Sequence, residues 1–348
     1  MANKREYSAA DPEQTLFTAK LINVRPLVNM LRTISFRPRA LCTISPVGIV
    51  FTVEDSRCIV AQAYLRTTLF ATFNYNTHLA HEQNKVQQQA ASFSQDREDS
   101  SESDGINEAT QIVLPLDNLI ECLTLFYGPS GAGSLSGFTS SHHVTGVQST
   151  SVLLGNSNPL DLRGATTAHI AFNGPGSDFE LMLEERGIIS VCRLATFVPE
   201  PPVDLEFSRF PVVQQLIIRS EWLRDAFNEL DPTSEAVTIS ISASAPYFRI
   251  STIGSNGSTE MTYSKDEKIL DSFFCNVEQE NRYKLSQILK CKQALAMSDK
   301  TKIRVNQRGF LSFQFMIPTD VDVSFVNFVY APLLYADELV DGTETHCV

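Results

Sequence analysis

The sequence contains the same helical pattern twice, and this apparent duplication is the feature that most restricts the fold. The segments LDNLIECLTLF at 116–126 and LSQILKCKQAL at 285–295 both carry apolar residues at the spacing of a helix with one buried face. Their apolar positions match one for one, and Cys122 corresponds to Cys291. We therefore expect the chain to consist of two halves with similar folds.

Two further pairs of segments support the duplication. A helical triplet near the front of each half is apolar at matching positions: Leu27, Leu31 and Ile34 in one half, and Leu223, Phe227 and Leu230 in the other. The segment GIISVCRL at 187–194 resembles GFLSFQFM at 309–316. The three pairs keep their order, so we expect each half to run strand, helix, strands, helix, strands.

Changes in composition set the expected domain boundaries. Two inserts in the first half are polar and of low complexity, and we expect them to be disordered because they cannot bury enough apolar surface. A proline-rich stretch without periodicity follows, as is typical of an interdomain linker. The expected units are a first domain at 14–197 with inserts at about 77–109 and 128–164, a linker at 198–210, a second domain at 211–335 and a flexible tail at 336–348.

Composition limits the class of protein. A chain of 348 residues that is 43% apolar can bury two cores of ordinary size. The net charge of −12 argues against a protein that coats nucleic acid generally, although one restricted surface can still be basic. The seven cysteines contain no C-x-x-C pair and several lie in apolar patterns, so we interpret them as core residues in a reducing compartment. No apolar run suggests a signal peptide or a membrane span.

Two of the expected helices have recognisable ends or faces. The first should run from about 23 to 34, with Asn23 as its N-cap and Pro26 in its first turn. Its polar face carries Arg25 and Arg32. The helix at 221–230 should bury an apolar face that includes Trp222.

Five local motifs together resemble one known family. They are LRTISFRPRALC at 31–42, WLRDAFNELD at 222–231, PYFRISTIG at 246–254, NRYKLS at 281–286 and RGFLSFQFMI at 308–317. They closely resemble the Rad-one subunit of the nine-one-one checkpoint clamp, a relative of proliferating cell nuclear antigen. The resemblance covers nearly all of the chain outside the two inserts and the termini.

The resemblance implies an α+β fold of two similar sliding-clamp domains, with antiparallel sheets outside and helices lining the inner face. It implies a heterotrimeric ring with two paralogous subunits, which a clamp loader places around double-stranded DNA at sites of damage. Repair and checkpoint proteins would then bind the ring in the nucleus. No cofactor, metal or membrane is implied.

The helices of a clamp face DNA, so their outward side chains should be basic enough to offset the phosphates. The residues expected to face DNA are Lys20, Arg25, Arg32, Arg224, Lys284, Lys290 and Lys292. The helix at 116–126 departs from this pattern because it offers only acidic groups. The alternative is that these basic residues form an ordinary solvated surface.

An enzymatic alternative also follows from the resemblance, because fungal members have been described as 3′ to 5′ exonucleases. Such chemistry needs clustered carboxylates that hold divalent metals. Asp178 with Glu180, and Asp204 with Glu206, have the D-x-E spacing of such a site. No later carboxylate motif accompanies them, and short acidic pairs are frequent in an acidic protein, so the non-enzymatic reading is preferred.

The linker offers a candidate groove for partner peptides. Clamps receive short apolar peptides near this region, and one wall could be formed by Phe197, Val198, Val203, Leu205 and Phe207. The alternative is that these residues only hold the linker against the sheet.

Overall fold

The computed structural model describes residues 15–82, 109–126, 165–200, 205, 207–255, 257–266, 268–319 and 322–333. Most of the two expected inserts and the tail therefore lie outside the described residues. One part of the first insert corrects the prediction of disorder. Residues 77–82 are helical, Asn76 Oδ1 accepts the backbone N–H of Leu79 at 3.2 Å, and Ala80 is buried. This turn is ordered because it has both a cap and an apolar contact.

Apart from the helical residues 77–82, the described part of the first half forms nine strands, two α-helices and one 3₁₀ turn. In order they are β1 (Phe17–Leu21), α1 (Arg25–Thr33), β2 (Arg39–Ser45), β3 (Gly48–Asp55), β4 (Ile59–Arg66), the 3₁₀ turn η1 (Thr67–Leu69), β5 (Thr72–Tyr75), β6 (Thr110–Pro115), α3 (Leu116–Leu123), β7 (Thr167–Phe172), β8 (Phe179–Glu185) and β9 (Ile188–Leu194).

The second half repeats this order after a short 3₁₀ turn, η2 (Phe207–Arg209). Its elements are β10 (Val212–Arg219), α4 (Ser220–Glu229), β11 (Ala236–Ile241), β12 (Phe248–Gly254), β13 (Gly257–Tyr263), β14 (Leu270–Cys275), β15 (Gln279–Lys284), α5 (Leu285–Ile288), η3 (Leu289–Cys291), α6 (Lys292–Met297), β16 (Lys300–Asn306), β17 (Leu311–Pro318) and β18 (Val323–Tyr330). The helix expected at 285–295 is thus two short α-helices joined by a 3₁₀ turn.

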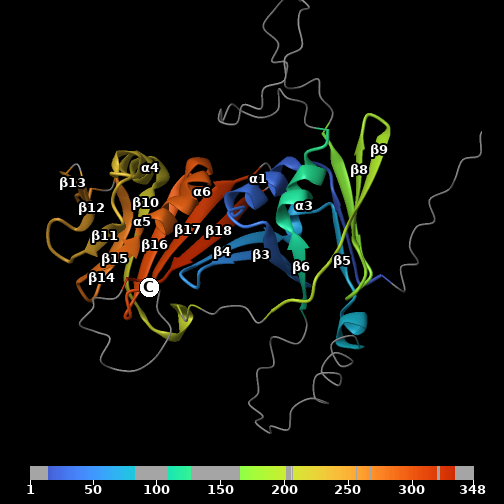
Figure 1. The fold of residues 1–348 in the computed structure, drawn as a ribbon, viewed down its shortest axis with the longest axis horizontal. Coiled ribbons are helices and arrows are strands. Elements are labelled where there is room, and N and C mark those ends of the chain that lie inside the picture. The colour runs from blue at the N-terminus through green and yellow to red at the C-terminus, as the bar shows by residue number, and fades with distance from the viewer. Residues whose placement is uncertain are drawn as a thin grey trace, which may run out of the picture.

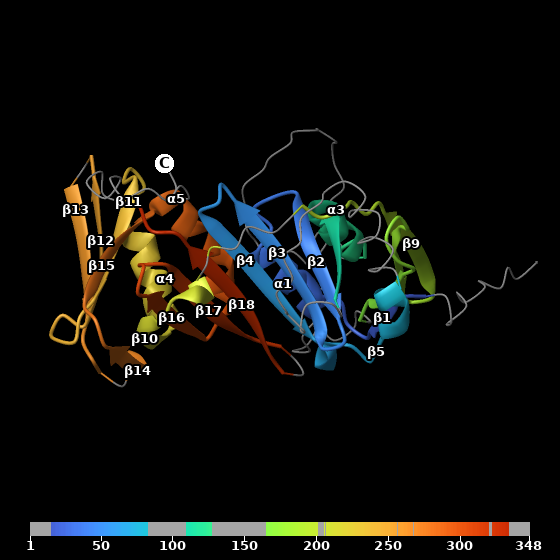
Figure 2. The same ribbon diagram turned by 90° about the horizontal axis from the view of Figure 1, so that it is seen from below.

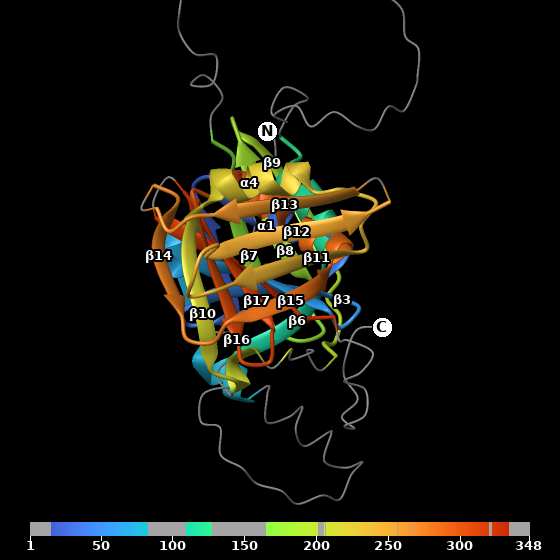
Figure 3. The same ribbon diagram turned by 90° about the vertical axis from the view of Figure 1, so that its left-hand side faces the viewer.

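The strands form three antiparallel sheets. One has the order β5-β1-β7-β8-β9, one has the order β13-β12-β11-β15, and the largest has the order β14-β10-β16-β17-β18-β4-β3-β2-β6. The largest sheet contains strands from both halves, because β18 pairs with β4 over residues 325–330 and 59–64. Figure 2 shows these strands side by side, red next to blue, and Figure 3 shows the four-stranded sheet at one end of the molecule.

The sheet positions correct one of the proposed sequence matches. GIISVCRL forms β9 and GFLSFQFM forms most of β17, but β17 occupies the sheet position of β8, and β9 that of β18. The two segments resemble each other because each follows an Arg-Gly turn, in which Gly187 and Gly309 have φ values of 78° and 79°. The similarity thus reflects the turn and the β pattern after it.

The helix ends and faces agree in part with the sequence pattern. Helix α1 begins at Arg25, two residues after Asn23, whose Oδ1 still accepts the backbone N–H of Arg25 at 3.0 Å. The predicted apolar triplets of α1 and α4 are buried. Trp222 is different, since it is 40% exposed and lies outside the buried face of α4.

The core extends through both halves as one large cluster of buried apolar side chains. Cys42 and Cys291 are fully buried in it, as expected for small core residues. Cys58 corrects the interpretation of the cysteines, because it is disulfide-bonded. Among the described residues, no helix has both the length and the apolar character needed to span a membrane.

Candidate nucleic-acid interface

Four helices lie next to one another along one side of the molecule. Contacts join α4 to α6, α6 to α1, and α1 to α3. Figure 1 shows these helices in that order between the two smaller sheets, with the nine-stranded sheet beneath them. We call this set α4-α6-α1-α3 the helix row. Each helix turns its apolar residues toward the sheets, so its polar residues form the outer surface of the row.

Charge is distributed unevenly along the helix row. The central helices are basic: α1 exposes Arg25 and partly exposes Arg32, while α6 begins with the exposed Lys292. The end helices carry the acidic groups, which are Asp117 and Glu121 on α3 and Glu221, Asp225 and Glu229 around Arg224 on α4. A duplex held against the row would therefore meet positive charge at the centre and negative charge at both ends.

Three of the predicted DNA-facing residues, Lys20, Lys284 and Lys290, lie outside the helix row. Lys20 is on β1, where Phe17, Ala19 and Leu21 are buried on one face of the sheet. Because side chains alternate along a strand, the side chain of Lys20 lies on the opposite face, toward solvent. Its neighbours across the strands are Thr72 and His169. Lys284 is the exposed last residue of β15.

Lys290 is held by an ion pair between the two halves of the chain. Its ammonium contacts Asp55 at the end of β3, and it lies 4.9 Å from the centre of the Phe36 ring. Arg37 forms a second ion pair with Asp55, and Gln287 Nε2 donates to Asp55 Oδ2 at 3.3 Å. This Asp55 cluster engages Lys290, whose side chain is only 22% exposed.

The pKa of Asp55 reflects this environment. Burial alone would raise the pKa, but hydrogen bonds from Lys290, Ser56 and Gln287, together with the charge of Lys290, lower it well below its usual range. The sequence analysis missed Asp55 because its partners Gln287 and Lys290 come from the other half of the chain. No local motif indicates that contact.

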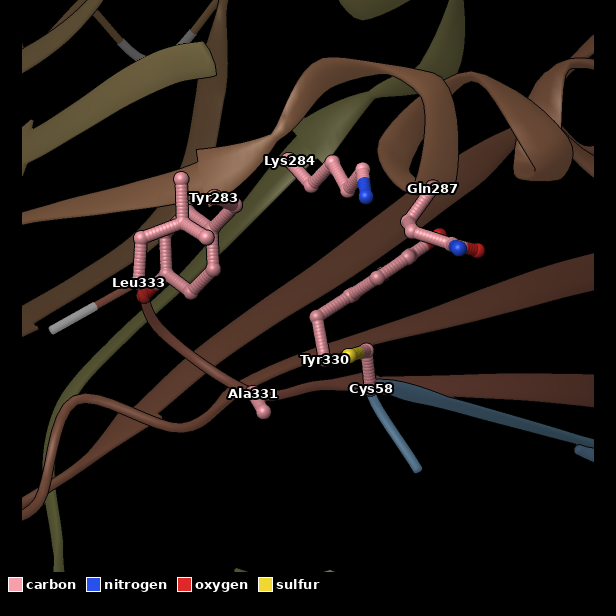
Figure 4. Close-up of a pocket in the computed structure, with 7 residues that line it drawn as sticks. All are labelled: Cys58, Tyr283, Lys284, Gln287, Tyr330, Ala331 and Leu333. Atoms are coloured by element: carbon pink, nitrogen blue, oxygen red, sulfur yellow. The ribbon is translucent and has the colours of Figure 1, made fainter. Parts of the chain in front are cut away.

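A small recess lies beside the same junction. It is lined by Cys58, Tyr283, Lys284, Gln287, Tyr330, Ala331 and Leu333. Figure 4 shows these side chains converging from the start of β4, from the β15–α5 connection and from the end of β18. Lys284 therefore belongs to the surroundings of the junction, and Tyr283 is fixed there because its hydroxyl donates to the backbone oxygen of Gly309 at 2.7 Å.

The linker residues fall into two groups. Leu205 is buried and Phe207 is partly buried against a small cluster with Val60, Phe310 and Val329, as the alternative interpretation expects. Phe197 forms an isolated β-bridge with Val113 on β6, and its side chain is 40% exposed. The guanidinium of Arg39 lies 4.3 Å from the centre of the Phe197 ring. Val198 is 86% exposed. Val203 lies outside the described residues.

The candidate exonuclease carboxylates do not gather into a larger cluster. Asp178 precedes β8, and Glu180 within β8 is ion-paired with Arg193 at 2.8 Å. Asp204 and Glu206 lie outside the described residues. Within the described ranges, no group of three or more His, Cys, Asp or Glu side chains is arranged to hold a metal ion.

Comparison with known proteins identifies the family. The model of the family described as repair protein Rad1/Rec1/Rad17 matches residues 16–317. The chain is 32% identical to the cell cycle checkpoint protein RAD1 of Homo sapiens, over 96% of each chain. It is 27% identical to the DNA damage checkpoint control protein rad1 of Schizosaccharomyces pombe, over 91% of this chain and 87% of that protein. It is 22% identical to the DNA repair exonuclease REC1 of Mycosarcoma maydis, over 86% of this chain and 87% of that protein.

The family model spans most of the described chain, and the human relative is matched along nearly its full length. Both matches include the two halves and the junction between them. The chain therefore belongs to the Rad1/Rec1/Rad17 family of repair proteins.

Proposed function

We propose that this protein is one subunit of a ring-shaped checkpoint clamp that encircles double-stranded DNA and scaffolds damage signalling and repair. Its relatives from human and fission yeast are named checkpoint proteins. In this proposal the two halves act as two clamp domains, and two paralogous subunits complete a heterotrimer. A clamp loader places the ring on DNA in the nucleus.

The observation that carries the proposal is the position of two free strand edges. Strand β18 pairs with β4 inside the chain. Strand β9 has the sheet position of β18, and β13 has that of β4, yet among the described residues each has a neighbouring strand on one side only. An unpaired edge is a template for another strand. The β18–β4 pairing can therefore be repeated between chains, with β9 and β13 as opposite ends of each subunit.

The helix row supports DNA as the molecule inside the ring. Neutralisation of phosphates by Arg and Lys releases counterions and favours binding. We propose that Arg25, Arg32 and Lys292 make the main contacts at the centre of the row. The acidic ends keep the overall contact weak, which suits a ring that must move along DNA.

A nuclease function has one observation in its favour, the name of the Mycosarcoma maydis relative. The carboxylate geometry gives the nuclease function little support, because Glu180 forms an ion pair with Arg193. Purified full-length protein, incubated with Mg²⁺ or Mn²⁺ and a 3′-labelled duplex, tests it. Cleavage that Asp178→Ala abolishes would favour the nuclease over the scaffold.

The edge pairing is tested by adding charge to β9. Ile188 and Ile189 are 63% and 57% exposed at this edge, so a double substitution by Lys should leave the fold intact and weaken assembly with the partner subunits. The measurement is the mass of the complex that copurifies with the tagged full-length chain. Val47→Lys is the matched control, because Val47 is 81% exposed in the β2–β3 turn. Loss of assembly in both variants, or in neither, would contradict the proposal.

Retention on DNA tests the helix row. Replacement of Arg25, Arg32 and Lys292 by Gln should weaken retention of the assembled ring on circular duplex DNA. The slope of log affinity against log salt should fall by up to about 0.9 for each lost phosphate contact. Lys20→Gln serves as the control, because Lys20 lies on the opposite face of its sheet. An unchanged slope in the triple variant would remove the DNA contacts from the proposal.

The exposed part of the linker is the proposed contact for partner peptides. Phe197 and Val198 present apolar surface to solvent, whereas Leu205 and Phe207 hold the linker to the sheet. Val198→Asp should weaken binding of repair or checkpoint peptides without lowering stability, because Val198 has little contact to lose. Equal binding by the two proteins in a peptide titration would argue against this surface.

A further inference from the structure

The first half of the chain brings two cysteines together. Cys122 lies on α3 and Cys192 on β9, and these two elements contact each other. Cys192 is the cross-strand partner of the fully buried Leu181, so its side chain faces the helices. Both cysteines are free and partly buried against the same core, and the Cys192 thiol is close enough to influence the pKa of Cys122.

The second half places a different residue at the corresponding contact. Cys291, which matches Cys122 in the repeated helix pattern, lies beside the hydroxyl of Tyr330 on β18. Strand β18 has the sheet position of β9. The helix-to-strand contact is thus shared by both halves, but only the first half, within the described residues, supplies a thiol from each side.

We propose that Cys122 and Cys192 form a reversible disulfide that fastens the edge strand β9 to helix α3 when a peroxide is present. In the first step one thiol loses its proton and the thiolate attacks hydrogen peroxide, which breaks the O–O bond and gives a sulfenic acid and hydroxide. The hydroxide takes up the released proton and becomes the first water. In the second step the other thiol displaces the sulfenic oxygen as a second water. Two thiols are oxidised to one disulfide, and one peroxide is reduced to two waters.

The surroundings assign a role to each thiol. Burial, the neighbouring Cys192 thiol and the charge of Glu121 raise the pKa of Cys122 to about 12. Cys122 is therefore mostly protonated near neutral pH and is the poorer first nucleophile. Cys192 takes the peroxide oxygen, and Cys122 resolves the sulfenic acid. Thiol reductants reverse the reaction by exchange through a mixed disulfide.

The consequence concerns the free edge. Within the part of the chain that the structure describes, β9 pairs with β8 alone, so it can open locally more easily than a strand paired on both sides. A bond to α3 opposes this opening. The formation of the disulfide rests on the placement of the two cysteines at the contact between α3 and β9, whereas any effect on subunit assembly also rests on the proposed function.

The test uses the full-length protein, first reduced, desalted and then treated with a small excess of hydrogen peroxide. Peptide mapping without reductant should find residues 122 and 192 cross-linked, and a thiol reductant should release the link. Hydrogen exchange should show slower exchange of the β9 amides in the oxidised protein than in the reduced protein. This readout requires neither DNA nor a partner subunit.

Matched variants separate this site from general oxidation. Cys192→Ser should abolish the cross-link and the change in exchange, with Cys192→Val as a second form suited to a strand if the serine variant unfolds. Cys275→Ser should leave both unchanged, because Cys275 is also a partly buried free cysteine but lies on β14. Absence of the 122–192 cross-link in the oxidised wild type would overturn the proposal. So would a cross-link that forms equally in protein unfolded by urea.

Discussion

Strands β9 and β18 occupy the same position in their sheets but have different surroundings. Strand β18 lies between β17 and β4, and its residue Phe328 is fully buried. Strand β9 has β8 on one side and no described strand on the other, and Ile188 and Ile189 are more than half exposed. The two strands have the same place in a repeated fold, but β18 is more buried because it also pairs with β4 of the same chain. We infer that the exposed apolar edge of β9 is available to pair with a strand of another chain.

The largest expected difference comes from truncating one apolar side chain in each strand. Phe328→Ala should lower the free energy of unfolding by about 3–5 kcal/mol, because it leaves a cavity next to Phe315 and Tyr330 at the junction of the halves. Ile189→Ala should change it by less than about 0.5 kcal/mol in the isolated chain. Urea denaturation of the two variants at equal protein concentration measures the difference. Similar losses would mean that β9 is already covered in the isolated chain.

The two Arg-Gly turns provide the next comparison. A Cβ on Gly187 would meet no atom within 4 Å, whereas a Cβ on Gly309 would lie 2.5 Å from Asn281 Oδ1. Both substitutions by Ala incur the strain of a positive φ. Gly309→Ala should therefore cost about 1–3 kcal/mol more than Gly187→Ala, since it adds a steric clash. Thermal or urea unfolding measures both, and a larger loss in Gly187→Ala would show that the turn of the first half is the more constrained.

The Asp55 cluster should give a smaller and pH-dependent effect. Asp55→Asn removes the charge that holds Lys290 and Arg37, and it should cost about 1–2 kcal/mol at neutral pH because the pairs are only partly buried. Glu180→Gln is the exposed control and should change stability by less than about 0.5 kcal/mol. Chemical denaturation measures the free energy of unfolding of both variants. Equal losses would mean that the Asp55–Lys290 pair between the halves stabilises the protein no more than the exposed Glu180–Arg193 pair does.

The pH dependence has a definite sign. The pKa of Asp55 is lowered in the folded protein. Its contribution to the free energy of unfolding is therefore fully present above the pKa of an aspartate in the unfolded chain, which is about 3.9. The stabilisation is lost as the pH falls below that value toward the folded pKa. The difference in unfolding free energy between wild type and Asp55→Asn should therefore shrink under acidic conditions. A difference that grows on acidification would contradict the assigned cause.

The sequence predicted the local parts of this molecule well. Helical spacing identified the buried triplets of α1 and α4, and alternating patterns placed the strands that flank them. The family motifs indicated the clamp resemblance before any contact was known. These predictions succeeded because apolar periodicity depends on residues that are close together in the chain. The order of the strands and the join between β18 and β4 could not be predicted in this way.

The candidate site was predicted less completely. Arg25, Arg32 and Lys292 were found from their helix faces, and the structure brings them to the centre of the helix row. Lys20 was grouped with them because it is close to Arg25 in sequence, but the alternation of β1 places it on the solvent face of a sheet. Lys290 was chosen from its helix face, and its pairing with Asp55 depends on a contact between residues far apart in the chain.

The sequence by itself determined that two copies of one pattern exist, which faces of their helices are apolar, and which family they resemble. Only the tertiary structure decided which strand edges are paired and which are left open, which lysine is engaged by a carboxylate, and which two cysteines meet. The reason is physical. Periodicity records how a segment buries its own side chains, whereas edge pairing, ion pairs and thiol contacts depend on segments that come together only when the chain folds.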